Sequence, residues 1–279
     1  MLLNQYIKTK QIELQRSGIK SARLDVLILL EDTLNKDRAW LLANQDLNLT
    51  SQNIEILNKL FKLRSTHIPL AYIRGHVEFY GRTFVINAST LVPRPESEDM
   101  VSELINLAAQ LDLASKNHKN KRWLRVADVG TGSGALGITA YLETSNTLVD
   151  LIDIDKDALK VAKINVDIFT LNLSIIKNDL LANLTNEYDV LLCNLPYVPN
   201  DFEVNEAAKK EPRIALYGGH DGLDLYRRLY KQLEERAIKP LYILSESLPM
   251  QHETLVRISE SHGYKLRNTN NYIQVFKLT

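Results

Sequence analysis

The sequence predicts an α/β protein in which a mostly parallel sheet carries helices on both faces, after a small helical bundle and a β-hairpin. Residues 1–67 repeat apolar side chains at helical spacing. Residues 68–95 contain two β-rich runs around a glycine turn. From residue 96 to residue 279, strand patterns alternate with helical ones, which is typical of a parallel sheet covered on both sides. We therefore expect three parts: a helical domain, a hairpin linker and an α/β domain.

The helices of residues 1–67 have recognisable ends. Gly18 ends the first helix, because glycine adopts the left-handed conformation at little cost. Ser21 and Asp37 are predicted caps of the next two helices, since their side chains can accept a hydrogen bond from the first turn. A fourth helix begins at Thr50 or Ser51. Its apolar face consists of Ile54, Leu57, Leu60 and Phe61.

The linker begins where Pro69 ends the helical pattern. Residues 77–80 and 83–86 are rich in β-formers and flank Gly81, so they predict a hairpin. Pro93-Arg94-Pro95-Glu96 follows. This segment either lines the mouth of a site or stiffens the junction between domains.

The rest of the chain predicts an ordered series of elements. The strands are residues 126–129, 148–153, 173–176, 188–193 and 241–244. The helices are residues 96–113, one after the glycines near 130, 157–169, one from about Asp221, and 250–261. Residues 264–278 predict two strands around Asn270-Asn271 and hence an antiparallel edge. Residues 114–122 are polar and basic and predict a loop, whereas Ser245-Glu246-Ser247 predicts the end of a strand.

Composition excludes several classes of function. Lys plus Arg and Asp plus Glu number 34 each, and a zero net charge argues against direct nucleic-acid binding. Cys193 is the single cysteine, so no disulfide framework exists and a reducing compartment is expected. The six histidines lack ligand spacing, so we predict no metal. Polar residues follow Met1-Leu2-Leu3 at once, and no apolar run approaches the ~20 residues of a membrane span, so neither a leader nor a membrane segment is expected.

A glycine-rich loop joins the first strand of the α/β domain to its helix. The segment Asp128-Val129-Gly130-Thr131-Gly132-Ser133-Gly134 lets the backbone turn tightly and approach a ligand closely. Asp153 ends the next strand, where a carboxylate can accept hydrogen bonds from ribose hydroxyls. Asp155 is its closest rival, and Asp157 is the predicted cap of the following helix. This pattern fits either a nicotinamide cofactor or S-adenosyl-L-methionine.

The segment Asn194-Leu195-Pro196-Tyr197, called the tetrapeptide below, follows the fourth strand of the α/β domain. A planar amide or amino nitrogen is a weak nucleophile, so an enzyme that methylates one must position it accurately. The Asn194 side-chain carbonyl and the Leu195 backbone carbonyl can accept its two hydrogens, Pro196 favours an extended Leu195, and Tyr197 can stack on the planar group. Hydride transfer has no use for this arrangement. The tetrapeptide therefore favours S-adenosyl-L-methionine as the cofactor.

Nearly the whole chain resembles the HemK/PrmC protein-(glutamine-N5) methyltransferases, which modify peptide chain release factors. The resemblance rests on the tetrapeptide, the glycine loop and four further segments. These segments are Ser21-Ala22-Arg23-Leu24-Asp25, residues 69–81, residues 91–98 and residues 211–228. The family resemblance implies a class I methyltransferase fold of the Rossmann-like type, a cytoplasmic monomer and a helical domain that contacts the release factor.

The resemblance also implies roles for individual residues. The cofactor would be bound by Gly130, Thr131, Gly132, Ser133, Gly134, Asp153, Asp179, Leu180 and Asn194. Asn194, Leu195, Pro196 and Tyr197 would hold the glutamine of a Gly-Gly-Gln motif and form the catalytic site, and S-adenosyl-L-homocysteine would be the second product. Asp179 would accept from the adenine amino group, or else cap a helix.

Three departures from the family pattern keep alternatives open. Leu195 stands where the family usually has proline, Leu180 where it often has an aromatic residue, and residues 268–271 lack its usual turn. Asn-Leu-Pro-Tyr also occurs in ribosomal RNA adenine dimethylases. An adenine-N6 methyltransferase of RNA or DNA is therefore the first alternative, and a non-catalytic cofactor-binding adaptor is the second.

Overall fold

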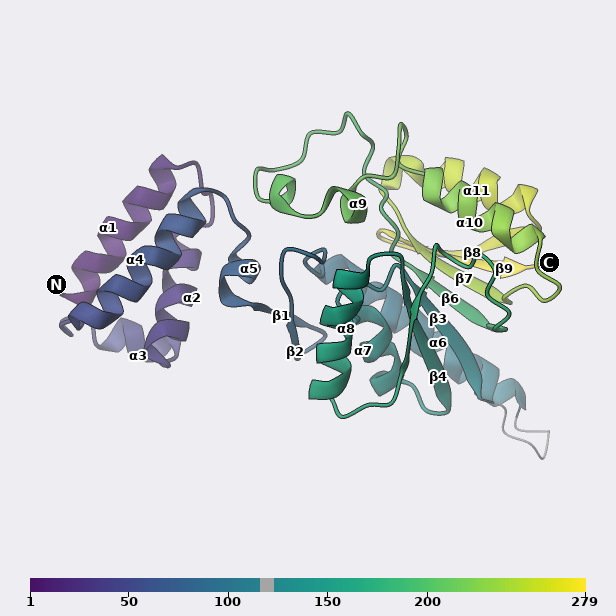
Figure 1. The fold of residues 1–279 in the computed structure, drawn as a ribbon, viewed down its shortest axis with the longest axis horizontal. Helices are drawn as coiled ribbons and strands as arrows, with labels where there is room; N and C mark the ends of the chain where they lie inside the picture. Colours follow the sequence, from purple (N-terminus) through teal and green to yellow (C-terminus); the bar gives the residue numbers. More distant parts are fainter. Residues whose placement is uncertain (116–122) are drawn as a thin grey trace. The chain divides into compact units, whose positions relative to one another are not determined.

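The computed structural model describes residues 1–115 and 123–279, which form two compact units (Figure 1). The first comprises Met1–His76 together with Val204–Lys210, and the second comprises Val77–Glu203 and Glu211–Thr279. The predicted loop at 114–122 falls almost entirely outside the described residues. Its first two positions instead complete a helix that ends at Ser115.

The first unit contains five α-helices among the described residues. They are α1 (Leu3–Arg16), α2 (Ala22–Leu34), α3 (Arg38–Ala43), α4 (Ser51–Ser65) and α5 (Leu70–Arg74). Their inward faces form one core, in which Leu14, Leu30 and Phe61 are fully buried. The apolar residues at helical spacing are the ones that face this core. Their burial stabilises the helices, because an isolated helix of this length is marginal without packing.

The helix ends confirm some sequence predictions and correct others. Asp37 and Thr50 cap α3 and α4 by accepting hydrogen bonds from Trp40 N (2.7 Å) and Asn53 N (3.1 Å). Ser21 occupies the cap position of α2, but its side chain makes no capping hydrogen bond. Pro69 does not end the helical pattern: it precedes α5, since proline is well accommodated at the start of a helix.

A buried ion pair joins α2 to α4. Arg64 Nε donates to Asp25 Oδ2 at 2.6 Å, and both side chains are nearly inaccessible. Arg64 also donates to the Ile68 carbonyl (3.2 Å), which fixes the chain beyond α4. Asp25 is therefore structural within the segment that resembles the methyltransferase family.

Replacing Asp25 with alanine is expected to lower the free energy of unfolding of this unit by about 3–5 kcal/mol, because Arg64 would keep a buried charge without a partner. Asp32→Ala is the matched control, since its pair with Arg74 is solvent-exposed and worth about 0–1 kcal/mol. Urea denaturation followed by circular dichroism measures both. Equal losses in the two variants would contradict this account.

The second unit begins with the predicted hairpin and continues as the predicted α/β series. The hairpin strands are β1 (His76–Phe79) and β2 (Arg82–Val85). The sheet strands are β3 (Leu124–Val129), β4 (Thr147–Asp153), β5 (Ser174–Lys177), β6 (Val190–Cys193), β7 (Tyr242–Glu246), β8 (Tyr264–Asn270) and β9 (Ile273–Leu278). The main helices are α6 (Glu98–Ser115), α7 (Ala135–Glu143), α8 (Lys156–Ile168), α10 (Asp224–Glu234) and α11 (His252–Ser261), with a short α9 (Arg213–Leu216).

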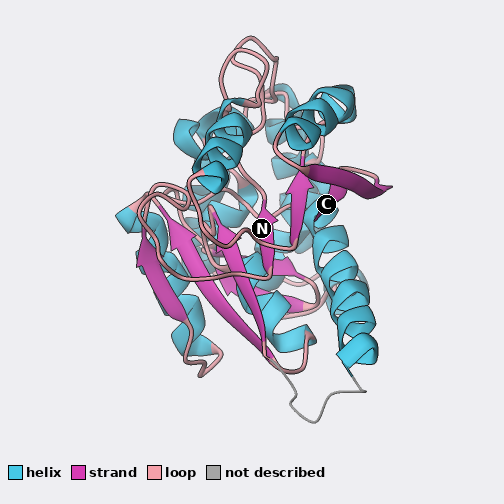
Figure 2. Ribbon diagram, turned by 90° about the vertical axis from the view of Figure 1, so that its right-hand side faces the viewer, coloured by secondary structure: helices cyan, strands magenta, loops and turns pink. Residues whose placement is uncertain are grey.

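The seven strands follow the order β5-β4-β3-β6-β7-β9-β8 in the described chain. Figure 2 shows the strands in magenta, with helices in cyan packed beside them. The pairs from β5 to β7 are parallel, whereas β9 runs antiparallel to both β7 and β8. The predicted antiparallel edge is thus confirmed. The chain order reverses between β3 and β6, and such a switch point places a crevice at the carboxyl ends of these strands.

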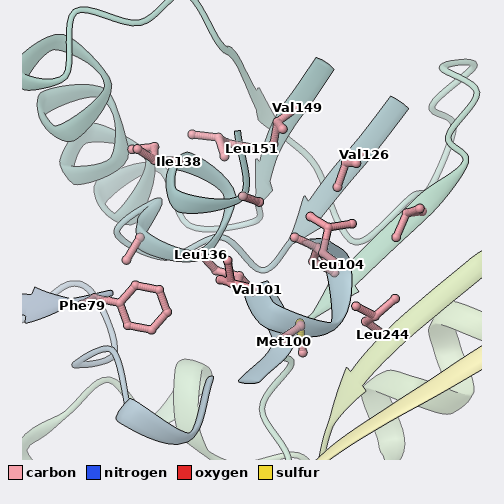
Figure 3. Packing of buried hydrophobic residues seen from close by; sticks show 14 of the residues in the cluster. Phe79, Met100, Val101, Leu104, Val126, Leu136, Ile138, Val149, Leu151 and Leu244 are labelled. Carbon is pink, nitrogen blue, oxygen red and sulfur yellow. The ribbon is translucent and has the colours of Figure 1, made fainter. Parts of the chain in front are cut away.

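A hydrophobic core lies on each face of the sheet. On one face, α6, α7 and α8 pack against β3 and β4 through side chains that include Val101, Leu104, Ile138 and Val149 (Figure 3). On the other face, α10 and α11 cover the strands through Tyr226, Leu229 and Leu255. The two sets of helices lie on opposite sides of the strands in Figure 1. None of the helices in residues 1–115 and 123–279 is long and apolar enough to cross a membrane.

Candidate active site

A pocket opens at the carboxyl ends of β3, β4, β5 and β6. Its wall includes the glycine loop, Asp153, Asp179, Leu180 and Asn194. Further lining residues are Phe79, Leu91, Pro93, Ser97, Asp128, Leu136, Asn178, Leu195, Pro196, Ile214, Ala215 and Arg228. The structure therefore brings most of the predicted site residues to one cavity. Gly134 and Tyr197 are not among the residues that line it.

The glycine loop turns because three of its residues have left-handed backbone. Gly130, Gly132 and Gly134 have φ of 77°, 55° and 81°, which glycine adopts without steric cost. The amides of Gly130 and Thr131 both donate to the Ile152 carbonyl (2.8 and 2.9 Å), which pins the loop to β4. Ala135 and Leu136, the first two residues of α7, line the pocket.

Asp153 stands at the end of β4, as the sequence predicts. Its carboxylate accepts from Gly132 N and from Asp155 N, each at 2.9 Å. Burial raises its pKa, and the hydrogen bonds to these two backbone amides oppose that shift. The predicted cap at Asp157 is wrong: Asp155 caps α8 by accepting from Asp157 N at 2.7 Å.

Asp128 is a site residue to which the sequence analysis assigned no function. Its carboxylate is buried below the loop and accepts from Thr131 Oγ1 (2.5 Å) and Gly137 N (2.9 Å). Burial raises the pKa of Asp128 to about 7, against the effect of these hydrogen bonds. Its place just before the glycines was the available signal. Gly137 lies so close to Asp128 and Leu151 that an added Cβ would fall within 2.8 Å of both.

This raised pKa predicts a pH-dependent stability. Between about pH 4 and pH 7 the folded chain holds a proton on Asp128 that the unfolded chain has released. The free energy of unfolding therefore gains from Asp128 at low pH and loses that contribution as pH rises through this window.

The Asp128→Asn variant lacks this titration. Its free energy of unfolding is expected to rise relative to the original chain between about pH 4 and pH 7, by a few kcal/mol at most. Urea titrations of both proteins across this range measure the difference. A difference that stays constant with pH would show that Asp128 does not titrate as described.

Asp179 and Leu180 follow β5 at the pocket rim. The Asp179 carboxylate pairs with the Arg228 guanidinium of α10. No helix begins at Asp179 in the described chain, so the alternative role as a helix cap is wrong. Leu180 is buried and has left-handed backbone (φ 53°), with its carbonyl held by Asn178 Nδ2 at 3.0 Å.

The tetrapeptide leaves the sheet directly after β6. Asn194 Nδ2 donates to Ser97 Oγ at 2.8 Å, and the Tyr197 hydroxyl donates to Glu246 Oε1 at 2.9 Å. Leu195 is 1% exposed and packs on the glycine loop, because a Cβ added to Gly130 would lie 3.3 Å from Leu195 Cδ2. The leucine side chain thus fills space against the loop at the position where the family usually has proline.

The segment Pro93-Arg94-Pro95-Glu96 reaches the pocket, as the first of its two predicted alternatives requires. Pro93 lines the wall. Arg94 Nη2 donates to Glu211 Oε1 (2.5 Å), and the other oxygen of this buried carboxylate accepts from Val92 N at 2.9 Å. This ion pair ties the entry to α6 to the loop beyond the tetrapeptide.

Three polar residues of the site gave no signal in the sequence. Ser97 and Glu246 hydrogen-bond to the tetrapeptide from other elements. Asn165, fully buried in α8, donates to the Ser133 carbonyl (2.8 Å) and exchanges two hydrogen bonds with Val85, so it links the glycine loop to the hairpin. Each acts over a long sequence separation. Among the described residues, no three His, Cys, Asp or Glu gather as metal ligands would.

Comparison with known proteins agrees with this architecture. The PrmC N-terminal domain matches residues 6–75, and the Methyltransferase small domain matches residues 105–211. The solved catalytic domain of hMettl16, in complex with a MAT2A 3′UTR hairpin, superposes with a TM-score of 0.55 at 14% identity, over 84% of this chain and 83% of that one. Sheet order, glycine loop and pocket together define a class I S-adenosylmethionine methyltransferase fold.

Sequence relatives show to which family of methyltransferases the chain belongs. The release factor glutamine methyltransferase of Bacillus anthracis is 34% identical over 74% of this chain and 72% of its own length. That of Coxiella burnetii is 31% identical over 92% and 90%. The chain belongs to the release factor glutamine methyltransferase family. It also matches the bifunctional methyltransferase of Rickettsia felis at 30% identity, over 98% of this chain but only 56% of that protein.

Proposed function

We propose that the protein transfers a methyl group from S-adenosyl-L-methionine to the side-chain amide nitrogen (N5) of the glutamine in the Gly-Gly-Gln motif of a peptide chain release factor. The observation that carries this proposal is that Asn194, Leu195 and Pro196 share one pocket wall with the glycine loop and Asp153. An acceptor and a methyl donor bound there would be neighbours. The names of the Bacillus anthracis and Coxiella burnetii relatives support a release factor as substrate.

The cofactor would occupy the end of the pocket formed by β3, β4 and β5. Asp153 would accept hydrogen bonds from the ribose hydroxyls, since its carboxylate lines the cavity while backbone amides hold it in place. The loop of residues 130–134 would pass close under the methionine part. Leu180 and Asp179 would flank the adenine, with Asp179 as acceptor for its amino group.

The acceptor amide would bind at the tetrapeptide. Asn194 Oδ1 and the Leu195 carbonyl would accept its two N–H groups, and Tyr197 would support the planar group. Bound S-adenosyl-L-methionine would supply the methyl group to this nitrogen and leave as S-adenosyl-L-homocysteine, and the methylated amide would lose one proton to solvent. Positioning and preorganised dipoles would supply the rate enhancement.

Three further assignments belong to this proposal. The helical domain of residues 1–67 would contact the release factor, because its helices form a core separate from that of the catalytic unit. The protein would act as a monomer in the cytoplasm. It would not bind nucleic acid directly, since the chain carries no basic surplus.

Labelled S-adenosyl-L-methionine tests the acceptor class. The purified chain is incubated with a release factor, with its Gly-Gly-Ala variant and with ribosomal RNA. Label in the release factor alone is expected. Label in RNA with none in the factor would replace the proposal by an adenine methyltransferase, and bound cofactor without any transfer would favour an adaptor.

A further inference from the structure

Two buried polar residues outside the tetrapeptide contact both of its ends. Ser97 lies in the 3₁₀ turn Pro95–Ser97 just before α6, and Glu246 is the last residue of β7. They are 3% and 0% exposed. Ser97 receives the Asn194 amide (2.8 Å) and Glu246 receives the Tyr197 hydroxyl (2.9 Å). The 3₁₀ turn before α6, the end of β7 and the tetrapeptide thus meet through these two hydrogen bonds.

The hydrogen bonds that Ser97 and Glu246 make to the tetrapeptide have a fixed direction. A carboxylate only accepts hydrogen bonds, and Tyr197 already donates to Glu246 Oε1. Glu246 Oε2 is buried and has no hydrogen-bond partner in the described chain, so it is free to accept one. Burial raises the pKa of Glu246, and hydrogen bonding by the Ser97 and Tyr197 hydroxyls opposes that shift. Ser97 Oγ accepts from Asn194 Nδ2, so its lone pair faces Asn194 and its own proton is available for the Glu246 carboxylate.

This direction determines which end of the Asn194 amide faces the pocket. Because Nδ2 is the only donor of that side chain, it turns towards Ser97 Oγ. Oδ1 then points away from Ser97 and has no partner among the described residues, and Asn194 itself lines the pocket. An acceptor nitrogen that carries hydrogens needs this carbonyl oxygen. In the opposite orientation, the N–H groups of Asn194 would face the N–H groups of the substrate, and no hydrogen bond could form.

We propose that Glu246 and Ser97 are positioning residues that set the orientation of the Asn194 amide, so that the site accepts substrates bearing an –NH₂ group. This inference rests on the proposed function for its catalytic consequence. Glu246 also anchors Tyr197, so one carboxylate organises the first and last residues of the tetrapeptide.

The chain of hydrogen bonds from Asn194 through Ser97 to Glu246 is called the relay below. The isosteric variant Glu246→Gln tests its direction. The glutamine amide can donate to Ser97 Oγ, which sends the Ser97 proton to Asn194 and reverses the Asn194 amide. A kcat roughly 100-fold lower is expected, the scale of losing one preorganised polar contact in an active site. KM for S-adenosyl-L-methionine should stay unchanged. Ser97→Ala should lower kcat and Ser97→Thr should restore it.

A double substitution tests the same logic in the other direction. In Asn194→Asp alone, two carboxylates compete for one Ser97 proton. In Asn194→Asp with Glu246→Gln, the new glutamine donates to Ser97 and Ser97 donates to residue 194, which again shows an oxygen to the pocket. The double variant should exceed the Asn194→Asp single variant in kcat by at least roughly 10-fold. A merely structural role for Glu246 predicts that the two losses add.

Ser245→Ala is the matched control, because Ser245 is equally buried on β7 but its hydroxyl has no partner in the described chain. Its kcat should equal that of the original chain, and thermal unfolding confirms that each variant folds. A kcat within about twofold of the original in both Glu246→Gln and Ser97→Ala would overturn the inference while leaving the proposed function intact.

Atomic-resolution crystal structures decide the question without activity. The original chain should direct Asn194 Nδ2 towards Ser97, and Glu246→Gln should reverse the amide. An unchanged amide in Glu246→Gln would overturn the inference. Absence of methyl transfer to a release factor by the original chain would instead overturn the proposed function, and the crystal structures would still test the relay.

Discussion

Asn194→Ala is expected to lower kcat for release-factor methylation by at least roughly 100-fold, because it removes the side-chain carbonyl that holds the acceptor amide in line with the methyl group. Asn194 is only partly buried at the end of β6, and its one hydrogen bond goes to Ser97. The fold and the thermal unfolding temperature should therefore change little. Single-turnover kinetics with saturating cofactor measure the effect.

The control for this variant is Asn200→Ala, an exposed asparagine six residues further along the same loop, whose turnover should remain normal. If Asn194→Ala turns over at the original rate, the acceptor site does not lie at the tetrapeptide. If it unfolds, the role of Asn194 is structural, which its partial exposure argues against.

The second large effect is expected at Asp153, which should govern cofactor affinity. Asp153→Asn removes a charged acceptor for the ribose hydroxyls, and hydrogen bonds to charged groups contribute about 1.5–3 kcal/mol. The Kd for S-adenosyl-L-methionine should rise roughly 10- to 100-fold, whereas kcat at saturating cofactor should fall much less. Isothermal titration calorimetry measures the affinity directly.

Asp157→Asn provides the comparison, because Asp157 is an exposed carboxylate in the first turn of α8 that pairs with Lys160. Its cofactor affinity should match that of the original chain. Equal affinity in Asp153→Asn would place the ribose elsewhere. Because Asp153 also accepts from Gly132 N, circular dichroism must show that the variant retains its fold.

The sequence predicted the parts of the fold that depend on local pattern. Strand and helix periods located the sheet, and the glycine loop and Asp153 were placed at its edge because a strand end and a glycine run are local signals. Cap residues were less certain. Asp155 rather than Asp157 caps α8, since carboxylates two residues apart are equivalent by pattern and only the backbone path separates them.

The residues that periodicity did not reveal are those that act across the fold. Ser97 meets Asn194 across 97 positions of sequence, and Glu246 meets Tyr197 across 49. A serine before a helix and a glutamate at a strand end have no distinctive pattern of their own. Asp128 was visible in the glycine motif, but its raised pKa depends on burial beneath the loop. Burial of this kind is set by packing.

The central claim is tested most directly by locating the methyl group. After reaction with the purified chain, the release factor is digested and its peptides are sequenced by tandem mass spectrometry. We expect one added methyl on the side-chain amide nitrogen of the glutamine in the Gly-Gly-Gln motif, absent when Asn194→Ala replaces the original enzyme. A methyl group on any other residue, or an unmodified glutamine alongside methylated adenine in RNA, would contradict it.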